Sequence, residues 1–570
     1  MISNFRTCSV TGLKVDRHTE NLVKINAVVA IVALLVGIIA AVGLVLTRWQ
    51  AVHLLPADMY YRFLTLHGLN MLIFFIIFFE MAILYFAGTV PLNARLPAPK
   101  LGYLAFILML GGAILVDVMV LQGKADVLFT SYVPLRADPL YYLGIIIFAV
   151  GALIVSFHFF GAIIIAKKEK TYEGSVPLVT FGALTAAIIA VITLVHGAMI
   201  YIPTFLWSLG LMNVDPQIYR MVWWALGHSS QQINVAAMVS VWYLLGGLTV
   251  GAVVLNEKIS RGAFFLYILF ISMASAHHLL VDPGVGPAWK VWNTSYAMYL
   301  AVLASMIHGF TVPAGIEMGQ RLRGFTKGKL EWIKKAPWGD PAFASLVLSI
   351  IIFGFMGGIT GVIIGTEQIN IIVHNTLRVP GHFHSTVVGG TAFAFMGLTY
   401  YVIPLIFRKK ISFWKLAKIQ PYLFGGGIVL FALSMSTLGI FGVPRRHWDI
   451  TFSQAPFQVE FNPVVNLLQA SMGLGGLLAA TGVLSFILIA VVSVFFGKTI
   501  QESDLKNPLT VGLPQGILAL PKQVHGKGES EEAHKVGAPA TMIFVGIFLA
   551  VFVLYYFVNW KMLSAVWKIG

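Results

Sequence analysis

Long apolar segments recur from one end of this 570-residue chain to the other, and they restrict its fold more than any other feature. Each segment has about 20 residues or more, enough for a helix to cross the ~30 Å hydrocarbon core of a bilayer. Only helices and closed barrels satisfy their backbone hydrogen bonds in lipid, and continuous runs of this length form helices. The mean hydropathy is +0.85 and only 11% of residues are charged, so we expect an all-α integral membrane protein.

We expect about thirteen transmembrane helices that form a single membrane domain over residues 1–570. The apolar segments that predict them are 22–47, 60–88, 101–122, 139–166, 176–202, 219–252, 262–282, 292–318, 341–366, 379–407, 419–442, 466–497 and 537–562. Segment 499–536 is polar and contains glycine and proline, which predicts a cytoplasmic loop before the last helix.

Basic residues predict the orientation, because lysine and arginine accumulate in cytoplasmic loops. They are densest in segments 321–335, 408–418 and 498–535, which places the N-terminus in the cytoplasm and the C-terminus outside. The net charge of +15 therefore reflects cytoplasmic loops, and we expect no nucleic-acid partner. Cys8 is the single cysteine, which excludes a disulfide framework and a thiolate-held metal cluster within the chain.

Six histidines stand in or at the ends of the predicted spans, where polar side chains are costly and mark functional sites. The predicted orientation puts all six in the outer half of the membrane. Six unrelated structural histidines would rarely share one depth, which favours a common metal and cofactor site over scattered structural roles. The six are His67, His228, His277, His278, His382 and His384.

Two of these histidines, His382 and His384, stand two residues apart at the start of one apolar segment. Such side chains point about 200° apart on a helix, so one helix can offer an imidazole to each of two centres. The alternative is two ordinary polar residues at a helix end. Imidazole binds iron, copper and zinc. The six then divide into a pair for one haem iron (His67, His384), one ligand for a second haem (His382) and three for a non-haem metal (His228, His277, His278).

The surrounding residues resemble the catalytic subunit of the haem-copper oxidase superfamily, and within it the B-type branch. The resemblance covers nearly all of the spans, and thirteen helices is the number in that branch. The motifs that carry it are Thr65-Leu66-His67-Gly68, Trp223-Trp224-Ala225-Leu226-Gly227-His228, Ala276-His277-His278-Leu279-Leu280-Val281-Asp282-Pro283-Gly284, Val373-His374-Asn375-Thr376, Pro380-Gly381-His382-Phe383-His384 and Pro444-Arg445-Arg446.

The resemblance implies the subunit I fold with two haems and one non-haem metal, copper or iron. It makes His67 and His384 the axial ligands of a low-spin haem, makes His382 the ligand of a high-spin haem, and places His228, His277 and His278 on the metal. Residues near the haem propionates would be His374, Asn375, Arg445 and Arg446. It also implies an electron-donor subunit II with its own metal or haem centre, cytochrome c or quinol upstream, and the cytoplasmic membrane of a prokaryotic cell.

The chain departs from the family pattern at Gln232, four residues after His228. Oxygen reductases of the B-type branch have a tyrosine there, cross-linked to the histidine, which supplies an electron and a proton when the O–O bond breaks. An amide can supply neither. Tyr243 lies 15 residues from His228, roughly 22 Å along a helix, and Tyr267 lies 10 residues from His277, roughly 15 Å. We therefore expect neither to replace the missing phenol.

Nitric oxide reductases of the superfamily also lack this tyrosine, because joining two NO molecules to give N2O and water needs only two electrons. The better-known ones carry a glutamate at the same place as a ligand to non-haem iron. Gln232 has the shape of glutamate without its charge, so its oxygen is a candidate weak ligand or hydrogen-bond partner. Gln232 and His228 are the predicted catalytic residues. We favour NO as the substrate over O2, with Gln232 as a packing residue of an oxygen reductase as the alternative.

Either reaction consumes protons. Ser305, His308 and Thr311 are spaced three residues apart on one face of the segment 292–318, and Tyr243 lies in the inner half of another. These four predict a polar row from the cytoplasm to the metal, although hydroxyls bonded to their own helix would explain the pattern equally well. A secondary transporter that uses histidines as proton relays is the competing class of function. A haem absorption band would distinguish the enzyme from the transporter.

Overall fold

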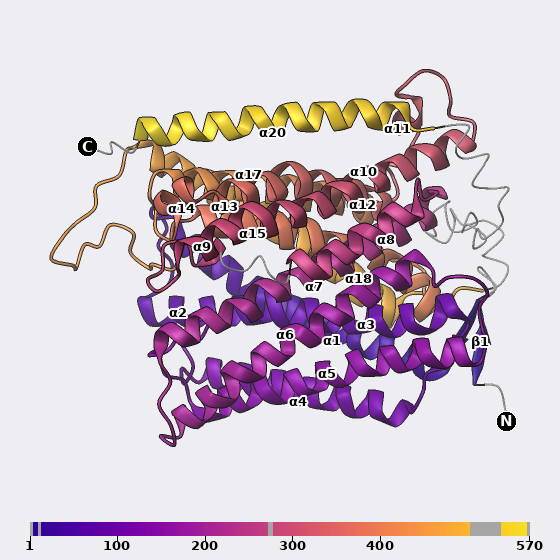
Figure 1. Ribbon diagram of the computed structural model, residues 1–570, viewed down its shortest axis with the longest axis horizontal. Helices are drawn as coiled ribbons and strands as arrows, with labels where there is room; N and C mark the ends of the chain where they lie inside the picture. Colours follow the sequence, from indigo (N-terminus) through magenta and orange to yellow (C-terminus); the bar gives the residue numbers. More distant parts are fainter. Residues whose placement is uncertain (1–3, 9–12, 272–276, 502–536, 567–570) are drawn as a thin grey trace.

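The structure, a computed structural model, describes residues 4–8, 13–271, 277–501 and 537–566 as a bundle of long helices (Figure 1). Twelve helical stretches in this part of the chain are long and apolar enough to span a membrane. The N-terminal end and the end of the last helix, α20 (Pro539–Val566), lie at opposite ends of the bundle (Figure 1). The helical membrane fold predicted from the apolar runs is therefore confirmed.

The first half of the chain contains β1 (Phe5–Thr7), β2 (Lys14–Asp16), α1 (Arg17–Arg48), α2 (Ala57–Gly68), η1 (Leu69–Phe74), α3 (Phe75–Thr89), η2 (Val90–Leu92), α4 (Pro99–Leu121), α5 (Pro139–Lys168), α6 (Leu178–Ser208), α7 (Pro216–Val250), α8 (Glu257–Leu266) and η3 (Tyr267–Ile271). The second half contains α9 (Pro287–Val291), η5 (Trp292–Ala297), α10 (Met298–Leu322), α11 (Glu331–Lys334), α12 (Pro341–Ile351), η6 (Ile352–Gly358), α13 (Ile359–Gly365), α14 (Glu367–Val373), α15 (Arg378–Phe383), η7 (His384–Ala392), α16 (Phe393–Val402), η8 (Ile403–Phe407), α17 (Trp414–Ile440), α18 (Val464–Phe496) and α20.

Three of the spans begin at an Asp-Pro pair. Asp138, Asp215 and Asp340 are the N-cap residues of α5, α7 and α12, and their carboxylates accept hydrogen bonds from backbone N–H groups of the first turn. The following proline takes the first helical position, where its missing N–H costs nothing. An aspartate cap satisfies a donor that would otherwise be orphaned and adds a favourable charge at the helix N-terminus. These local signals explain why the three helices start where they do.

Two expectations fall partly outside the described residues, and one feature of the structure was not expected. The span expected at 262–282 is not among the twelve: it begins within α8 and continues through η3, and residues 272–276 lie outside the described residues. A two-stranded antiparallel hairpin, β1 with β2, precedes α1. The loop expected at 499–536 is described only to residue 501. The orientation in the membrane stays a prediction.

Several spans contain π-helical turns that no sequence pattern announced. The longest, η7, begins at His384, and η6 packs beside it. A π-turn widens the helix by one residue per turn and occurs most often at functional sites. The spans that carry His228, His382 and His384 are also the most buried of the described spans. In each, 83% of the residues in the most apolar stretch are buried, whereas the share in α20 is 6%. The histidines therefore lie at the centre of the bundle and α20 at its edge.

Candidate haem and metal site

His67 and His384 form a parallel pair. His67 lies one residue before the end of α2 and His384 begins η7, and their ring centres are 6.3 Å apart with an interplanar angle of 9°. Their Nδ1 atoms lie 3.1 Å from the carbonyl of Gly37 and 2.7 Å from that of Pro380. An Nδ1–H that donates to a carbonyl leaves Nε2 as the free ligand atom.

The spacing of this pair fits one metal ion between the two rings. Two collinear metal–nitrogen bonds of about 2.0 Å, plus about 1.15 Å from each nitrogen to its ring centre, separate the ring centres by about 6.3 Å. The rings of His67 and His384 line a mostly apolar cavity together with Arg445 and Arg446. Parallel axial imidazoles with cations at the edge of an apolar cavity fit a six-coordinate haem iron and its propionates.

His382 is held in the same way but also faces a second space. Its Nδ1 lies 3.1 Å from the carbonyl of Gly357 and 3.0 Å from Oγ1 of Thr360, which again leaves Nε2 free. Gly361 lets the ring approach η6 and α13, since a Cβ there would lie 2.9 Å from the imidazole. His382 lines the cavity of the His67–His384 pair and also a cavity of about 130 Å³ that His228 and His277 line. This position suits the single axial ligand of a second haem.

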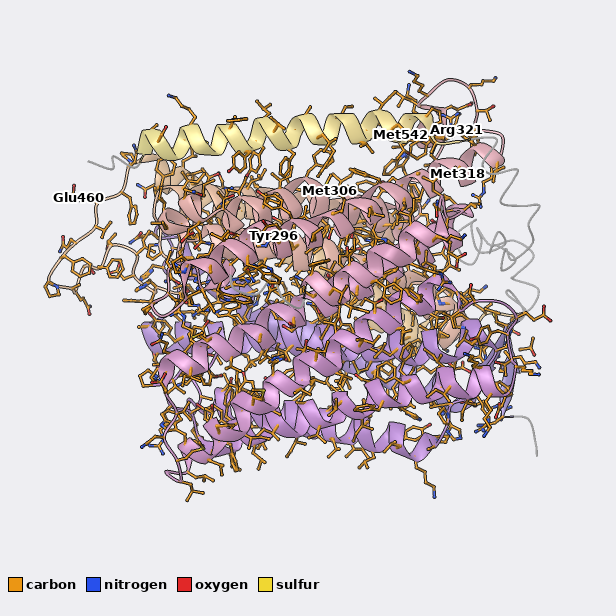
Figure 2. The ribbon with its side chains drawn as sticks, viewed as in Figure 1. Tyr296, Met306, Met318, Arg321, Glu460 and Met542 are labelled. Atoms are coloured by element: carbon orange, nitrogen blue, oxygen red, sulfur yellow. The ribbon has the colours of Figure 1, made fainter. Side chains whose placement is uncertain are left out.

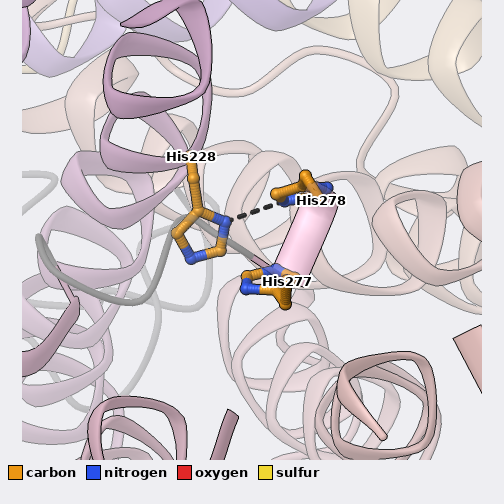
Figure 3. A group of neighbouring side chains, drawn as sticks. All are labelled: His228, His277 and His278. Atoms are coloured by element: carbon orange, nitrogen blue, oxygen red, sulfur yellow. Dashed lines mark hydrogen bonds between the residues drawn. The ribbon is translucent and has the colours of Figure 1, made fainter. Parts of the chain in front are cut away.

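His228, His277 and His278 lie close enough together to hold one metal ion and are named here the metal-binding group (Figure 3). One ligand atom from each lies within 4.8 Å of the others. Nδ1 of His228 is 3.0 Å from Nε2 of His278, close to the roughly 3.3 Å that separates two nitrogens of a tetrahedral metal site. Trp224 stacks on His278 with ring centres 3.8 Å apart and restrains its rotation. The three imidazoles therefore fit one copper, iron or zinc ion.

Gln232 contacts the opposite side of His228. Its amide nitrogen lies 2.6 Å from Nε2 of His228, whereas Nδ1 of that ring faces His278. Of the two roles that the sequence allowed, hydrogen-bond partner and weak ligand, this geometry favours the first. With the amide turned by 180°, its oxygen accepts the Nε2–H and leaves the Nδ1 lone pair for a metal. Gln232 is thus placed to set which nitrogen of His228 can bind.

A cationic network lies at the edge of the haem cavity. Arg445 donates to Oδ1 of Asn375 from Nε at 3.1 Å and Nη2 at 2.8 Å. Burial, together with the charge of Arg446, lowers the pKa of the Arg445 guanidinium to about 9. Burial, and then the charge of Arg445, lowers the pKa of His374 to about 3. Buried neighbouring cations are stabilised by an anion, which fits the propionate-binding role that the resemblance implies.

Sequence reasoning assigned no role to three other members of this network. Arg220 forms a 2.9 Å ion pair with Asp282. The guanidinium carbons of Arg220 and Arg446 lie 5.3 and 5.6 Å from the ring centre of Tyr132. Asp282 stood within one of the recognised motifs, but nothing in the sequence paired it with a residue 62 positions earlier. Tyr132 lies in a loop, where no helical periodicity predicts which residues it contacts.

Three of the four residues of the predicted proton row, Tyr243, His308 and Thr311, come together. The Tyr243 hydroxyl lies 3.0 Å from Nδ1 of His308 and 2.8 Å from Oγ1 of Thr311. Ser305 does not touch this group; its hydroxyl is 3.0 Å from that of Tyr267 and it lines the cavity of the metal-binding group. Sequence reasoning missed Tyr267 as a member of the row. Thr311 also lies 3.5 Å from the His308 carbonyl, the local contact that the alternative reading predicts.

Comparisons with known proteins identify the family of the chain. Residues 21–478 match the family described as "Cytochrome C and Quinol oxidase polypeptide I". A cytochrome c oxidase subunit 1 of Thermus thermophilus is 31% identical over 401 residues, which cover 69% of this chain and 70% of the relative. A probable quinol oxidase subunit 1 of Staphylococcus aureus is 25% identical over 508 residues, which cover 85% and 72%.

A solved structure shares the fold. It is a haem-copper terminal oxidase dimer, and its chain superimposes with a TM-score of 0.80 at 23% identity, covering 93% of this chain and 100% of the other. At that identity the structural likeness concerns the fold alone. The match to the family, however, covers residues 21–478 and so most of the spans. The chain therefore belongs to the cytochrome c and quinol oxidase polypeptide I family, the subunit I family of the haem-copper oxidases.

Proposed function

We propose that this protein is the catalytic subunit of a nitric oxide reductase in the haem-copper superfamily. Two molecules of NO, two electrons and two protons give one N2O and one water. The observation that carries the proposal is Gln232, whose amide lies 2.6 Å from Nε2 of His228, where oxygen reductases of the resembled branch hold a tyrosine. No tyrosine is among the described residues that line the cavity of the metal-binding group.

An amide suits the two-electron reaction better than the four-electron reduction of O2. It has no phenolic proton and is not oxidised, so it supplies neither the extra electron nor the extra proton that O–O cleavage takes from a tyrosine. Instead it orients His228, and with its oxygen toward the ring it raises the basicity of that ligand. The bound haems and metal would hold NO and supply the two electrons. The residues of this chain orient the imidazoles, exclude water and carry protons.

Protons are expected to arrive along the row that begins at Tyr243. Its hydroxyl joins His308, Thr311 and Ser260, the last at 3.0 Å, and so links three helices at one point. The Tyr267–Ser305 pair is the proposed next step, since the ring centre of Tyr267 lies 5.5 Å from that of His308 and Ser305 lines the cavity of the metal-binding group. Hydroxyls and imidazole both donate and accept, so such a row can pass a proton with small rotations.

The electron donor is proposed to reside on a separate subunit II with its own metal or haem centre. Relatives are named cytochrome c oxidase or quinol oxidase, so cytochrome c or a quinol is the proposed upstream donor. The proposed location is the cytoplasmic membrane of a prokaryotic cell, with the N-terminus inside and the C-terminus outside.

Oxygen reduction is the second candidate, because the relatives are named oxidases and Tyr267 contacts a residue that lines the cavity of the metal-binding group. Its hydroxyl is 3.0 Å from Ser305, which lines the cavity of the metal-binding group. If Tyr267 served as the redox-active phenol, Tyr267→Phe would abolish O2 reduction and leave the binding of both haems intact.

The test compares anaerobic NO turnover with O2 turnover of the same purified protein, using one artificial donor, together with metal analysis. If the proposal is correct, the protein forms one N2O for every two NO that it consumes, and it consumes O2 slowly. Rapid O2 consumption with negligible N2O would overturn it. Gln232→Tyr is the companion variant, in which NO turnover should fall. A purified protein without a haem absorption band would instead support the transporter alternative.

A further inference from the structure

Two residues stand where the two cavities of the site meet. Among the residues that the structure describes, Gln231 and His382 are the two that line both the cavity of the parallel histidine pair and the cavity of the metal-binding group. Gln231 follows His228 by three residues on α7, and Gln232 follows it by four. At 100° per residue, the two glutamines project about 60° to one side of His228 and about 40° to the other. Gln232 lines the metal cavity alone, whereas Gln231 also borders the space toward His382.

The amide of Gln231 has no protein partner. Among the contacts of the described residues, no hydrogen bond involves its side chain. The other polar side chains of the metal cavity, histidines apart, are bonded elsewhere: Gln232 to His228, Ser305 to Tyr267, Thr386 to the carbonyls of His382 and Phe383, and Thr391 to the carbonyl of Asn234. The side chains between the helices are mostly hydrocarbon (Figure 2). An amide is costly in such surroundings unless something bonds to it, so position 231 offers a donor to a molecule that the cavity receives.

The chemistry of the reaction indicates which molecule that is. Under the proposed function the gas reacts between His382 and the metal-binding group, which is the space that Gln231 borders. NO that is being reduced gains negative charge on its oxygen, and a preorganised N–H aimed at that oxygen stabilises the charge. An amide donates without a charge of its own, so it needs no counter-ion in an apolar cavity.

We propose that Gln231 is a catalytic residue that contacts the substrate: its side-chain N–H donates a hydrogen bond to the oxygen of NO held between His382 and the metal-binding group. Gln231 keeps its proton throughout. The two electrons come from the bound centres and the two protons from the row that begins at Tyr243. The neighbouring glutamines thus have separate tasks, since Gln232 orients His228 and Gln231 contacts the gas. The inference rests on the proposed function for the identity of that gas.

Binding of NO and CO to the reduced, purified protein with its haems tests the contact without turnover. NO is added at less than one molecule per protein, so that the N–N bond cannot form. Gln231→Leu removes the donor and keeps much of the side-chain volume. Loss of one hydrogen bond should speed NO dissociation about 2- to 13-fold, and it should raise the N–O stretching frequency. CO dissociation should change by less than about twofold, because the oxygen of CO accepts hydrogen bonds weakly.

Thr391→Val is the matched control. Thr391 lines the metal cavity but not the other one, and its hydroxyl lies 3.5 Å from the carbonyl of Asn234. This variant should leave NO dissociation within about twofold of the unaltered protein. Gln231→Val repeats the test with a smaller side chain that also lacks the N–H, so it should shift both NO signals in the same direction as Gln231→Leu. The spectrum of the low-spin haem shows that each variant has assembled.

Unchanged NO dissociation and N–O frequency in both Gln231 variants would refute the contact. Equal acceleration of NO and CO would refute it too, since the effect would then come from the size of the side chain. The proposed function can fail separately. If the unaltered protein formed no N2O while the Gln231 variants still shifted the NO signals, the contact with the bound gas would stand and the assignment of NO as the substrate would fall.

Discussion

Replacing Gln232 by leucine should weaken metal binding at the His228 group. Leucine keeps much of the side-chain volume but removes the amide that lies 2.6 Å from Nε2 of His228. An imidazole N–H left buried without a partner costs about 1–3 kcal/mol. Loss of a partner behind a metal-binding histidine typically lowers metal affinity about 10- to 100-fold, which corresponds to about 1.4–2.7 kcal/mol. The two estimates agree, so we expect a decrease of this size.

The assay is competition of the purified protein with a chelator of known affinity, followed by metal analysis. The low-spin haem spectrum serves as an internal control, because His67 and His384 are held by backbone carbonyls that the substitution does not touch. Gln231→Leu is the matched variant, since Gln231 also lines the cavity of the metal-binding group. Among the contacts of the described residues, no hydrogen bond joins the Gln231 side chain to His228, His277 or His278.

Metal affinity unchanged in Gln232→Leu would refute the claim that this amide orients His228. A loss of equal size in Gln231→Leu would also contradict it, because the effect would then reflect packing of the cavity wall. Gln232→Glu separates orientation from general stability. Its carboxylate can accept the same Nε2–H, so metal binding should return to at least the original affinity.

Four further predictions concern other parts of the chain. Thr311→Val should slow turnover several-fold without changing the haem spectra, because it removes a hydroxyl 2.8 Å from that of Tyr243; stopped-flow turnover checks this. His384→Ala should abolish the low-spin haem signal in the visible and EPR spectra and leave metal content intact. Glu317→Gln should expose the start of α20 to limited proteolysis, because a neutral amide replaces the anion that Thr541 and Arg321 contact. Partial burial raises the pKa of the Asp449 carboxyl, but hydrogen bonds from neighbouring residues outweigh it and lower the pKa overall, so its loop should be protected in hydrogen exchange above pH ~4 and lose protection as the pH falls further.

The predicted depth in the membrane singled out six histidines, and the structure places them around two cavities that His382 lines in common. Apolar length fixed the spans, basic residues predicted their direction, and direction gave each histidine a depth. His382 and His384 could be assigned to two centres because the helical period separates their directions. The Asp-Pro pairs likewise carry enough local chemistry to mark the start of α5, α7 and α12.

What the sequence could not supply are the contacts made by backbone carbonyls and by residues far apart in the chain. Gly37 and Gly357 accept from His67 and His382, yet any residue offers a carbonyl and no side-chain pattern marks these two. The π-turns of η6 and η7 depend on packing between the helices. The contact between the hydroxyls of Tyr267 and Ser305 is of the same kind. The rise per residue gives a distance along one helix, roughly 15 Å from Tyr267 to His277, but it does not predict a contact with a neighbouring helix.

The way four of the imidazoles are held indicates one position where the reaction can vary without disturbing the proposed haem ligands. His67, His382 and His384 each donate from Nδ1 to a backbone carbonyl, which no substitution can remove, so the chemistry of these ligands is fixed by the fold. His228 is reversed: Nδ1 faces the metal site, and its outer nitrogen meets the side chain of Gln232. A side chain can change without moving the helix. Under the proposed function, residue 232 is therefore the place where a phenol, a carboxylate or an amide would alter the electrons and protons available to the gas while the proposed haem ligands stay as they are.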